Sequence, residues 1–150
     1  MGPGDVVADM AALTDAHVRD FLLAGTRTGK VAWVAPSGRP LVTPIWFVLD
    51  GDSVVFNTGE DSAKAKAMRA EPRVSFVVDL EEPPYGFVKV DGRVEFADDL
   101  DEVRRWATEI GGRYMGADRA EEFGRRNGVP GELLVRIHPD RVTAAFDVSD

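Results

Sequence analysis

The sequence predicts a mainly antiparallel α+β domain of roughly six strands and three or four short helices. Three observations favour this fold class. Stretches rich in valine and phenylalanine recur at strand length, the links between them are short and contain glycine, and only a few capped helical segments interrupt them. No repeat or long linker divides the 150 residues, so we expect a single domain over residues 14–150.

The start of the chain, residues 1–13, predicts a flexible tail. It carries Asp5 and Asp9 and lacks both the basic start and the sustained apolar run of a signal peptide. A helix is expected to begin near Thr14 and to end just before Gly25, because its apolar residues fall on one stripe.

Three strands are expected after this helix, and the links between them contain Gly38 and Gly51. Links this short predict an antiparallel meander. Pro44 cannot donate a ladder hydrogen bond, so it marks either a bulge or a place where the strand faces a ligand instead of a neighbour. The three strands are expected at Lys30–Pro36, Arg39–Asp50 and Ser53–Thr58.

A basic segment follows in a chain whose formal net charge is -8. After a turn through Asn57, Thr58 and Gly59, Ser62 is expected to cap a short helix, which places Lys64 in the first helical turn. The helix dipole disfavours a cation there, and a bound phosphate would compensate. The alternative is a solvated surface lysine that tolerates a penalty of a few tenths of a kcal/mol.

The second half of the chain predicts two strands, two helices and a final strand region. A helix opened by Asp98 or Asp99 is expected to end at Gly111-Gly112, and Asp118 with Glu121 forms a capping-box pattern for a shorter helix. The final region is expected to break near His138-Pro139, with Arg136 and His138 on a solvated face. The strands are expected at Arg73–Leu80 and Gly86–Phe96, and the final region at Glu132–Val148.

Composition excludes several classes of function. The chain has no cysteine, which removes disulfides and thiolate sites, and its two histidines make a metal centre unexpected. A pI near 4.8 argues against a nucleic-acid partner. No apolar run is long enough to span a membrane, and we expect a cytoplasmic protein. Neither a GxSxG elbow nor a GxGxxG turn is present.

Five short motifs occur in an order and at spacings that resemble the pyridoxamine 5'-phosphate oxidase-like superfamily of split β-barrel flavin and deazaflavin proteins. Two later segments, RYMG at 113–116 and LVRIHPDRV at 134–142, are similar to actinobacterial members assigned to the deazaflavin coenzyme F-420. The resemblance implies a six-stranded split β-barrel with flanking short helices. The five motifs are GRP (38–40), TPIWF (43–47), VVFNT (54–58), SAKAKAMRAEPRVSF (62–76) and VKVDGRVEF (88–96).

In that superfamily a flavin-type cofactor lies across the barrel at a homodimer interface. The resemblance therefore implies one group of residues against the ring and a second group near the phosphate. Ala63 stands where oxidases that use flavin mononucleotide (FMN) carry an arginine, which leaves room for the singly charged phosphodiester of F-420. The implied cofactor-binding residues are Thr43, Pro44, Ile45, Trp46, Phe47, Asn57, Thr58, Ser62 and Lys64.

We therefore expect a homodimeric oxidoreductase that transfers hydride between F-420, or else FMN, and a small unsaturated substrate. The cofactor would do the chemistry, so no catalytic side chain is assigned, although Tyr85, Lys89 and Tyr114 are candidates for donating a proton or binding substrate. The alternatives are a non-catalytic flavin- or haem-binding or storage protein, and an interaction module with an empty barrel. Apart from the resemblance, aromatic residues at strand positions such as Trp33, Trp46 and Phe47 more often belong to a core or a dimer interface than to a cofactor platform.

Overall fold

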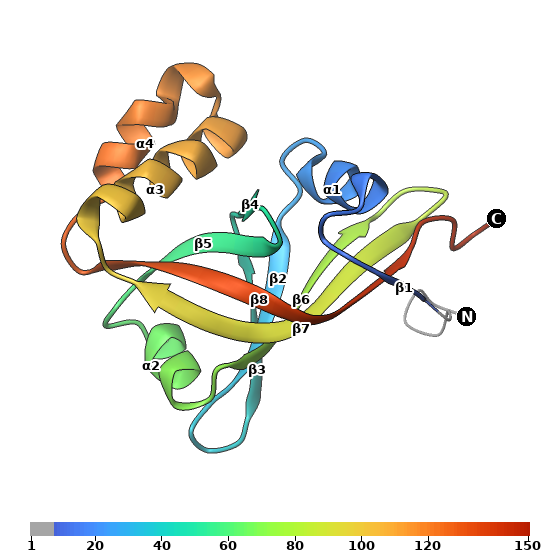
Figure 1. The fold of residues 1–150 in the computed structure, drawn as a ribbon, viewed down its shortest axis with the longest axis horizontal. Helices are drawn as coiled ribbons and strands as arrows, with labels where there is room; N and C mark the ends of the chain where they lie inside the picture. Colours follow the sequence, from blue (N-terminus) through green and yellow to red (C-terminus); the bar gives the residue numbers. More distant parts are fainter. Residues whose placement is uncertain (1–7) are drawn as a thin grey trace.

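The computed structural model describes residues 8–150, in which eight strands form one antiparallel sheet (Figure 1). Their order across the sheet is β3-β2-β6-β7-β8-β5-β4, and β1 pairs with β8 beyond the end of β5. This confirms the predicted fold class. The strands are β1 (Asp9–Ala11), β2 (Gly29–Val34), β3 (Pro40–Ile45), β4 (Val48–Asp50), β5 (Ser53–Gly59), β6 (Arg73–Leu80), β7 (Gly86–Ala97) and β8 (Glu132–Ala145).

The sheet must curl, because its two end strands are consecutive in the chain. Only Trp46 and Phe47 separate β3 from β4, which lie at opposite ends of the strand order. The sheet therefore closes at this kink into the barrel that the family resemblance implied, with eight strands among residues 8–150 instead of six. The single strand expected over Arg39–Asp50 is thus two strands, and Pro44 lies within β3 opposite Lys30 without a bulge. An edge strand tolerates proline, because the missing N–H can face away from the sheet.

Two helices contribute side chains to the core of the barrel, and two lie against its outer side. Val18 and Leu22 of α1, together with Met68 of α2, belong to the main core cluster inside the sheet. Val103 and Trp106 of α3 pack on the outer side of β5 and β8 and form a second cluster there. The helices are α1 (Ala16–Leu23), α2 (Ala63–Ala70), α3 (Leu100–Met115) and α4 (Ala120–Asn127), with a 3-10 turn, η2, at Ala117–Arg119.

Part of the segment expected to be a tail belongs to the sheet. β1 pairs with the last third of β8, with Met10 opposite Thr143, and the side chain of Leu13 is buried in the core. The edge of β8 beyond β5 would otherwise lack a partner, and β1 covers it. Residues 1–7 of the expected tail lie outside the described residues.

The prediction that α3 ends at Gly111-Gly112 was wrong, since the helix continues to Met115 and is capped by Gly116 at φ 102°. The glycines instead allow α4 to pack closely against α3. A Cβ on Gly111 would clash with the Cβ of Phe123 in α4. The absence of a side chain therefore lets α4 lie directly against α3.

The predicted capping box at the start of α4 is also absent. Asp118 lies in η2, and Arg119 occupies the N-cap of α4 without a side-chain cap. The backbone N–H of Ala120 donates to the carbonyl of Ala117 in the preceding turn. The turn therefore satisfies the first N–H of α4 through the backbone, whereas the capping box was expected to bind the N–H groups of Asp118 and Glu121 through side chains.

The final strand region is one continuous strand with a bulge, not two strands. Gly92 pairs with Pro139 and Asp91 with Arg141, which leaves Asp140 as the extra residue. The predicted break near His138-Pro139 therefore lies close to a real irregularity, but pairing continues beyond it.

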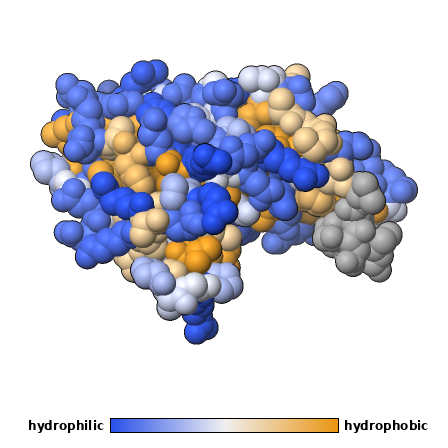
Figure 2. All heavy atoms as spheres, turned by 60° about the horizontal axis from the view of Figure 1, so that its bottom comes forward, coloured by the Kyte–Doolittle hydropathy of each residue, from blue (hydrophilic) through white to orange (hydrophobic). Residues whose placement is uncertain are grey.

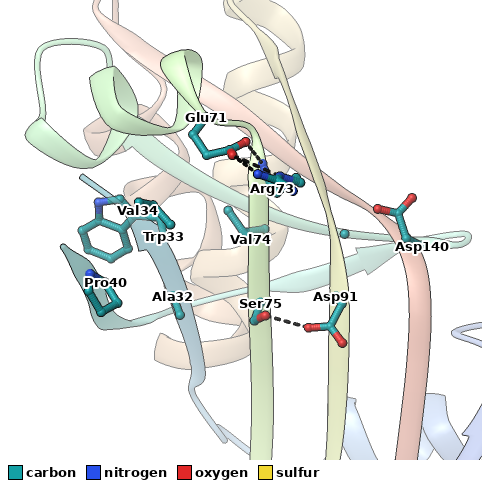
Figure 3. A pocket seen from close by; sticks show the side chains of 11 residues that line it. Ala32, Trp33, Val34, Pro40, Glu71, Arg73, Val74, Ser75, Asp91 and Asp140 are labelled. Atoms are coloured by element: carbon teal, nitrogen blue, oxygen red, sulfur yellow. Dashed lines mark hydrogen bonds and ion pairs between the residues drawn. The ribbon is translucent and has the colours of Figure 1, made fainter. Parts of the chain in front are cut away.

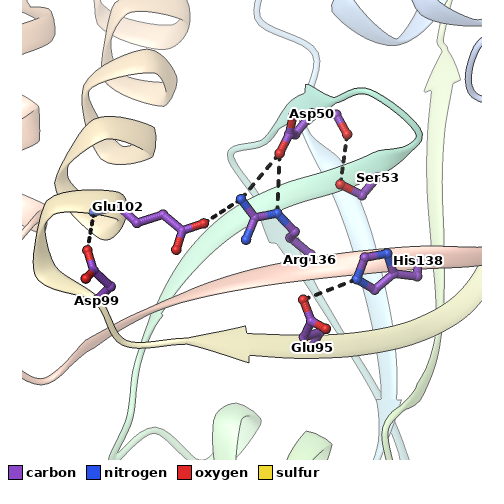
Figure 4. A network of polar contacts seen from close by, with 7 residues as sticks. All are labelled: Asp50, Ser53, Glu95, Asp99, Glu102, Arg136 and His138. Carbon is purple, nitrogen blue, oxygen red and sulfur yellow. Dashed lines mark hydrogen bonds and ion pairs between the residues drawn. The ribbon is translucent and has the colours of Figure 1, made fainter.

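Arg136 corrects a second expectation, because its side chain is only 17% exposed (Figure 4). Its guanidinium donates to Glu102 of α3 at 2.7 Å and to Asp50 of β4 at 3.3 Å. This network joins α3 to the barrel. His138, by contrast, is exposed as expected and lies 3.5 Å from Glu95. No helix within residues 8–150 has both the length and the apolar character needed to cross a membrane.

Candidate functional site

Two strand edges without partners border an opening in the barrel wall. β3 pairs with β2 on one side and has no strand on the other. β4 covers β5 only from Ser53 to Val55, so residues 56–59 pair on one side alone, with β8. The two edges start together at the Trp46–Phe47 kink and diverge toward α2, as Figure 1 shows. They offer free backbone donors and acceptors to a ligand.

One end of the opening is the corner where β5 leads into α2. Ser62 caps α2 as predicted, and its Oγ accepts from the N–H of Ala65 at 3.0 Å. The same Oγ lies 3.2 Å from the Oγ1 of Thr58. Asn57 and Thr58 belong to β5, which runs to Gly59, so the turn begins later than expected. The side-chain nitrogen of Asn57 is buried and has no hydrogen-bond partner within residues 8–150.

Lys64 lies at this corner and is half-buried. Its amine lies 5.6 Å from the centre of the Phe56 ring and makes no hydrogen bond or ion pair within the described part of the chain. Burial lowers the pKa of Lys64 from its usual value, and the negative charge of Glu132 partly offsets this shift. An unpaired, half-buried amine beside free helical N–H groups is suited to holding an anion.

Glu132 is a residue that the sequence reasoning missed. It begins β8 opposite Gly59, and its Oε2 is buried without a hydrogen-bond partner among residues 8–150. Burial raises the pKa of its carboxyl group, while Lys64 acts in the opposite direction. No local signal marked it, because a glutamate at the start of a strand is ordinary and its proximity to α2 is a product of the fold.

The other end of the opening is the kink between β3 and β4. The indole of Trp46 is 39% exposed and stacks on the ring of Tyr114 in α3. Phe47 is fully buried, its N–H donates to the Tyr114 hydroxyl, and its carbonyl accepts from Arg113. Ile45 is buried as well, whereas Pro44 is exposed. Thr43 lies opposite Val31 on the partly buried side of β3.

Arg113 and Tyr114 hold the kink in place. Arg113 donates to the carbonyls of Leu22, Gly25, Arg27 and Phe47, so it ties the end of α1 to the kink. The hydroxyl of Tyr114 donates to the Arg27 carbonyl at 2.8 Å. Burial lowers the pKa of Arg113 and raises that of Tyr114. Because the Tyr114 hydroxyl already donates its proton to the backbone, this residue stabilises the kink and is not free to protonate a substrate.

The nine predicted residues thus form two groups. Thr58, Ser62 and Lys64 meet at the α2 corner. Asn57 lies next to them on β5, but its side chain is on the face opposite to Phe56 and Thr58. The five residues 43–47 run along the β3 edge into the kink. Two other candidates lie elsewhere, since Tyr85 is in the β6–β7 hairpin and Lys89 pairs with Asp91 on β7.

Five surface hollows among residues 8–150 are lined by other residues than these nine. The hollow in Figure 3, of about 370 Å³, is on the outer side of β2, β6 and β7, where the Ser75 hydroxyl donates to Asp91 at 2.6 Å. Four further hollows are lined by other residues near α1, α3 and β8. Within this one chain, therefore, the predicted site is an open surface bounded by two strand edges.

Comparison with known proteins gives one family and many similar folds. The family model for pyridoxamine 5'-phosphate oxidase matches residues 14–146. A conserved hypothetical protein of Mycobacterium tuberculosis, Rv2991, is 24% identical with a TM-score of 0.77, over 92% of this chain and 87% of that one. A structure titled F420 reductase is 25% identical with a TM-score of 0.64, over 82% of this chain and 94% of that one.

A third similar structure is a FAD-binding protein of Mesorhizobium loti. It is 22% identical with a TM-score of 0.63, over 93% of this chain and 97% of that one. No curated protein sequence matches this chain significantly.

Proposed function

Because the chain belongs to the pyridoxamine 5'-phosphate oxidase family, we propose that it binds a flavin-type cofactor in the opening between β3 and β5. Proteins of similar fold include a structure titled F420 reductase and a FAD-binding protein. The observation that carries the proposal is the unpaired, half-buried amine of Lys64 beside the capped N-terminus of α2.

The α2 corner suits a phosphate group. Lys64 supplies the positive charge, the free N–H groups of the first turn of α2 supply donors, and the hydroxyls of Ser62 and Thr58 lie beside them. Binding a phosphate here would relieve the unfavourable placement of Lys64 at the positive end of the helix dipole.

The strand edges suit a planar ring system. Residues of β3 from Thr43 to Ile45 and residues of β5 from Phe56 to Thr58 present unpaired backbone groups. Trp46 adds an exposed aromatic face at the kink. Phe47 would act indirectly, since its side chain is buried and both its backbone groups are already bonded.

F-420 fits the corner better than FMN. Among residues 8–150, Lys64 is the one cation at this corner, because Ala63 has no charge and Lys66 is exposed on another part of the helix. A phosphodiester carries one negative charge, whereas a phosphomonoester carries between about 1.5 and 2 near pH 7. The phosphodiester therefore places less uncompensated negative charge beside the single lysine.

The bound cofactor would supply hydride chemistry, and the protein would position it against a small, unsaturated substrate. The residues of this chain would bind the phosphate, orient the ring along the strand edges and shield one side of it with Trp46. The Tyr114 hydroxyl would hold the kink through its two backbone hydrogen bonds.

We further propose that two copies of the chain complete the site. The β3 edge and the outer sheet surface carry exposed apolar side chains, with Val42 67% and Met10 68% exposed. Figure 2 shows such apolar patches between polar regions on one side of the molecule. A second copy would cover this surface and would turn the open edge of one chain into an enclosed site.

The experiment that tests this function is a titration of the purified protein with F-420 and, separately, with FMN, followed by absorbance and fluorescence. Lys64→Ala should weaken cofactor binding by about 1.5–3 kcal/mol, on the order of 10- to 100-fold. Lys66→Ala is the matched control, because it removes an exposed lysine from the same helix. Equal affinity of the wild type and Lys64→Ala would remove Lys64 from the site.

A second candidate function is a non-catalytic protein that binds or stores a flavin or haem. It is favoured by the state of Tyr114, whose hydroxyl is committed to the backbone and is not free for acid–base chemistry. Reduced cofactor that binds but is not oxidised by any enone, quinone or tetrapyrrole in a panel would support this candidate over the oxidoreductase.

A further inference from the structure

Glu132 and Lys64 lie at one corner because the turn before α2 is fastened to the start of β8. Glu132 is opposite Gly59 in the register of β5 and β8. The N–H of Glu60 donates to the Gly131 carbonyl at 2.8 Å, and the N–H of Ser62 donates to the Gly59 carbonyl at 3.1 Å. A Cβ on Gly59 would meet no atom within 4 Å, so space remains open on the β5 side of this corner.

Neither charged group at this corner is neutralised. Lys64 and Glu132 do not approach within ion-pair distance, and neither forms an ion pair with any other residue in the described range 8–150. Oε2 of Glu132 is buried without a hydrogen-bond partner there. Each group nevertheless shifts the pKa of the other, against the larger effect of burial. The two charges are therefore close enough to interact, although they form no ion pair.

An anion held by Lys64 consequently meets the field of a carboxylate. Lys64 and Glu132 together contribute no net charge when both are ionised, so a singly charged phosphodiester leaves one unit of negative charge at the corner. With a phosphomonoester, up to one further unit of negative charge stays uncompensated beside Glu132, at the edge of the protein interior where charges are poorly screened. Ala63 offers no second cation. Repulsion of this kind is a common source of ligand specificity.

We propose that Glu132 selects the cofactor by the charge of its phosphate, admitting a phosphodiester and disfavouring a phosphomonoester. The inference rests on the proposed function, because it requires a phosphate at the Lys64 corner. It makes Glu132 a specificity-determining residue at that site, although Glu132 supplies no attractive contact to the phosphate.

The test is a four-way cycle of affinities. Wild type and Glu132→Gln are each titrated with the deazaflavin ending in a free ribityl phosphate and with the methyl phosphodiester of that compound, which differ only in the charge and methylation of the phosphate. If the protein prefers the flavin ring, FMN and its methyl phosphodiester replace these two ligands. The ratio of monoester affinity to diester affinity is then compared between the two proteins. Any contribution of the ligands that is the same in both proteins cancels in this comparison.

Glu132→Gln should strengthen binding of the monoester relative to the diester on the order of 5- to 10-fold. Glu60→Gln is the matched control, because it removes the same charge from the exposed turn of the same corner and should leave the ratio unchanged. If the ratio is unchanged in Glu132→Gln while Lys64→Ala still weakens binding, the role of Glu132 is overturned but the proposed phosphate site is not. Absence of binding to every phosphorylated ligand would overturn the proposed function itself. Thermal unfolding of both variants shows that they are folded.

Discussion

The indole of Trp46 lies parallel to the phenol ring of Tyr114, with ring centres 5.0 Å apart and an angle of 5° between the planes. Arg113 lies 4.8 Å from the centre of the same Tyr114 ring and 4.6 Å from that of Phe47. These contacts hold the point where the two ends of the sheet meet. The position of the β3 edge, and so the shape of the opening, depends on them.

Tyr114→Phe should destabilise the protein by about 1–3 kcal/mol while preserving the stack on Trp46. The phenol oxygen accepts from the Phe47 N–H and donates to the Arg27 carbonyl. Removing it leaves the Phe47 N–H without a partner in a partly buried region and leaves the Arg27 carbonyl with only the longer bond, 3.4 Å, from Arg113. Urea unfolding measures the change. Tyr85→Phe is the control, because Tyr85 is exposed and its loss of a hydroxyl should change stability by less than about 0.5 kcal/mol. Equal effects of the two substitutions would contradict this role.

Trp46→Ala should weaken cofactor binding about 3- to 10-fold, in line with the value of an aromatic contact. Trp46→Phe retains a flat ring that can still stack on Tyr114 and should recover most of the affinity. The titration described for Lys64 measures both variants. If alanine binds cofactor as well as the wild type does, then Trp46 only supports the kink and does not contact the ring.

Gly111→Ala should destabilise the protein by about 1–3 kcal/mol, even though alanine favours helices. The added methyl group would overlap Phe123, and the close packing of α3 and α4 cannot absorb it without a shift. Gly112→Ala is the matched control in the same helix. Its Cβ would lie 3.3 Å from that of Ala120, a contact that a small movement relieves, so its gain in helix propensity should offset most of the cost. Denaturant unfolding of the two variants should therefore give clearly different midpoints.

Local chemistry explains what could be predicted from the sequence. Ser62 and Asp99 both cap their helices through side-chain oxygens that accept a backbone N–H three residues later, a relationship contained in a few consecutive residues. Gly111 shows the limit of such signals. The same residue type ends helices and allows helices to approach closely, and only the position of Phe123 decides between these roles.

The unpredicted part of the candidate site consists of contacts between distant segments. Tyr114 bonds to Phe47 across 67 residues of sequence, and Arg113 to Leu22 across 91. Arg136 was expected in solvent because strand alternation gives a side chain a face without revealing that α3 covers that face. Glu132 was missed for the same reason, because its relation to Lys64 exists only once β8 has paired with β5.

Glu132→Gln should also change how stability depends on pH. Burial raises the pKa of the Glu132 carboxyl in the folded protein above its usual 4.5, and the attraction of Lys64 opposes this shift only in part. The folded state therefore holds this proton to a higher pH than the unfolded state does. The contribution of Glu132 to stability falls as the pH rises from about 4.5 to the folded pKa.

The glutamine variant lacks this titration, so it should be more stable than the wild type at pH 7, and the difference should vanish below about pH 4. Solvent still reaches the corner, which keeps the expected gain within about 1 kcal/mol. The lowered pKa of Lys64 also destabilises the folded protein, but this destabilisation decreases only as the pH rises toward 10.5. It therefore does not contribute to a change in stability between pH 4 and pH 7. Urea unfolding from pH 4 to pH 7, with Glu60→Gln as the exposed control, measures the effect. A variant that is less stable than the wild type at pH 7 would show that attraction to Lys64 outweighs burial, and that Glu132 is held as an ion pair in solution.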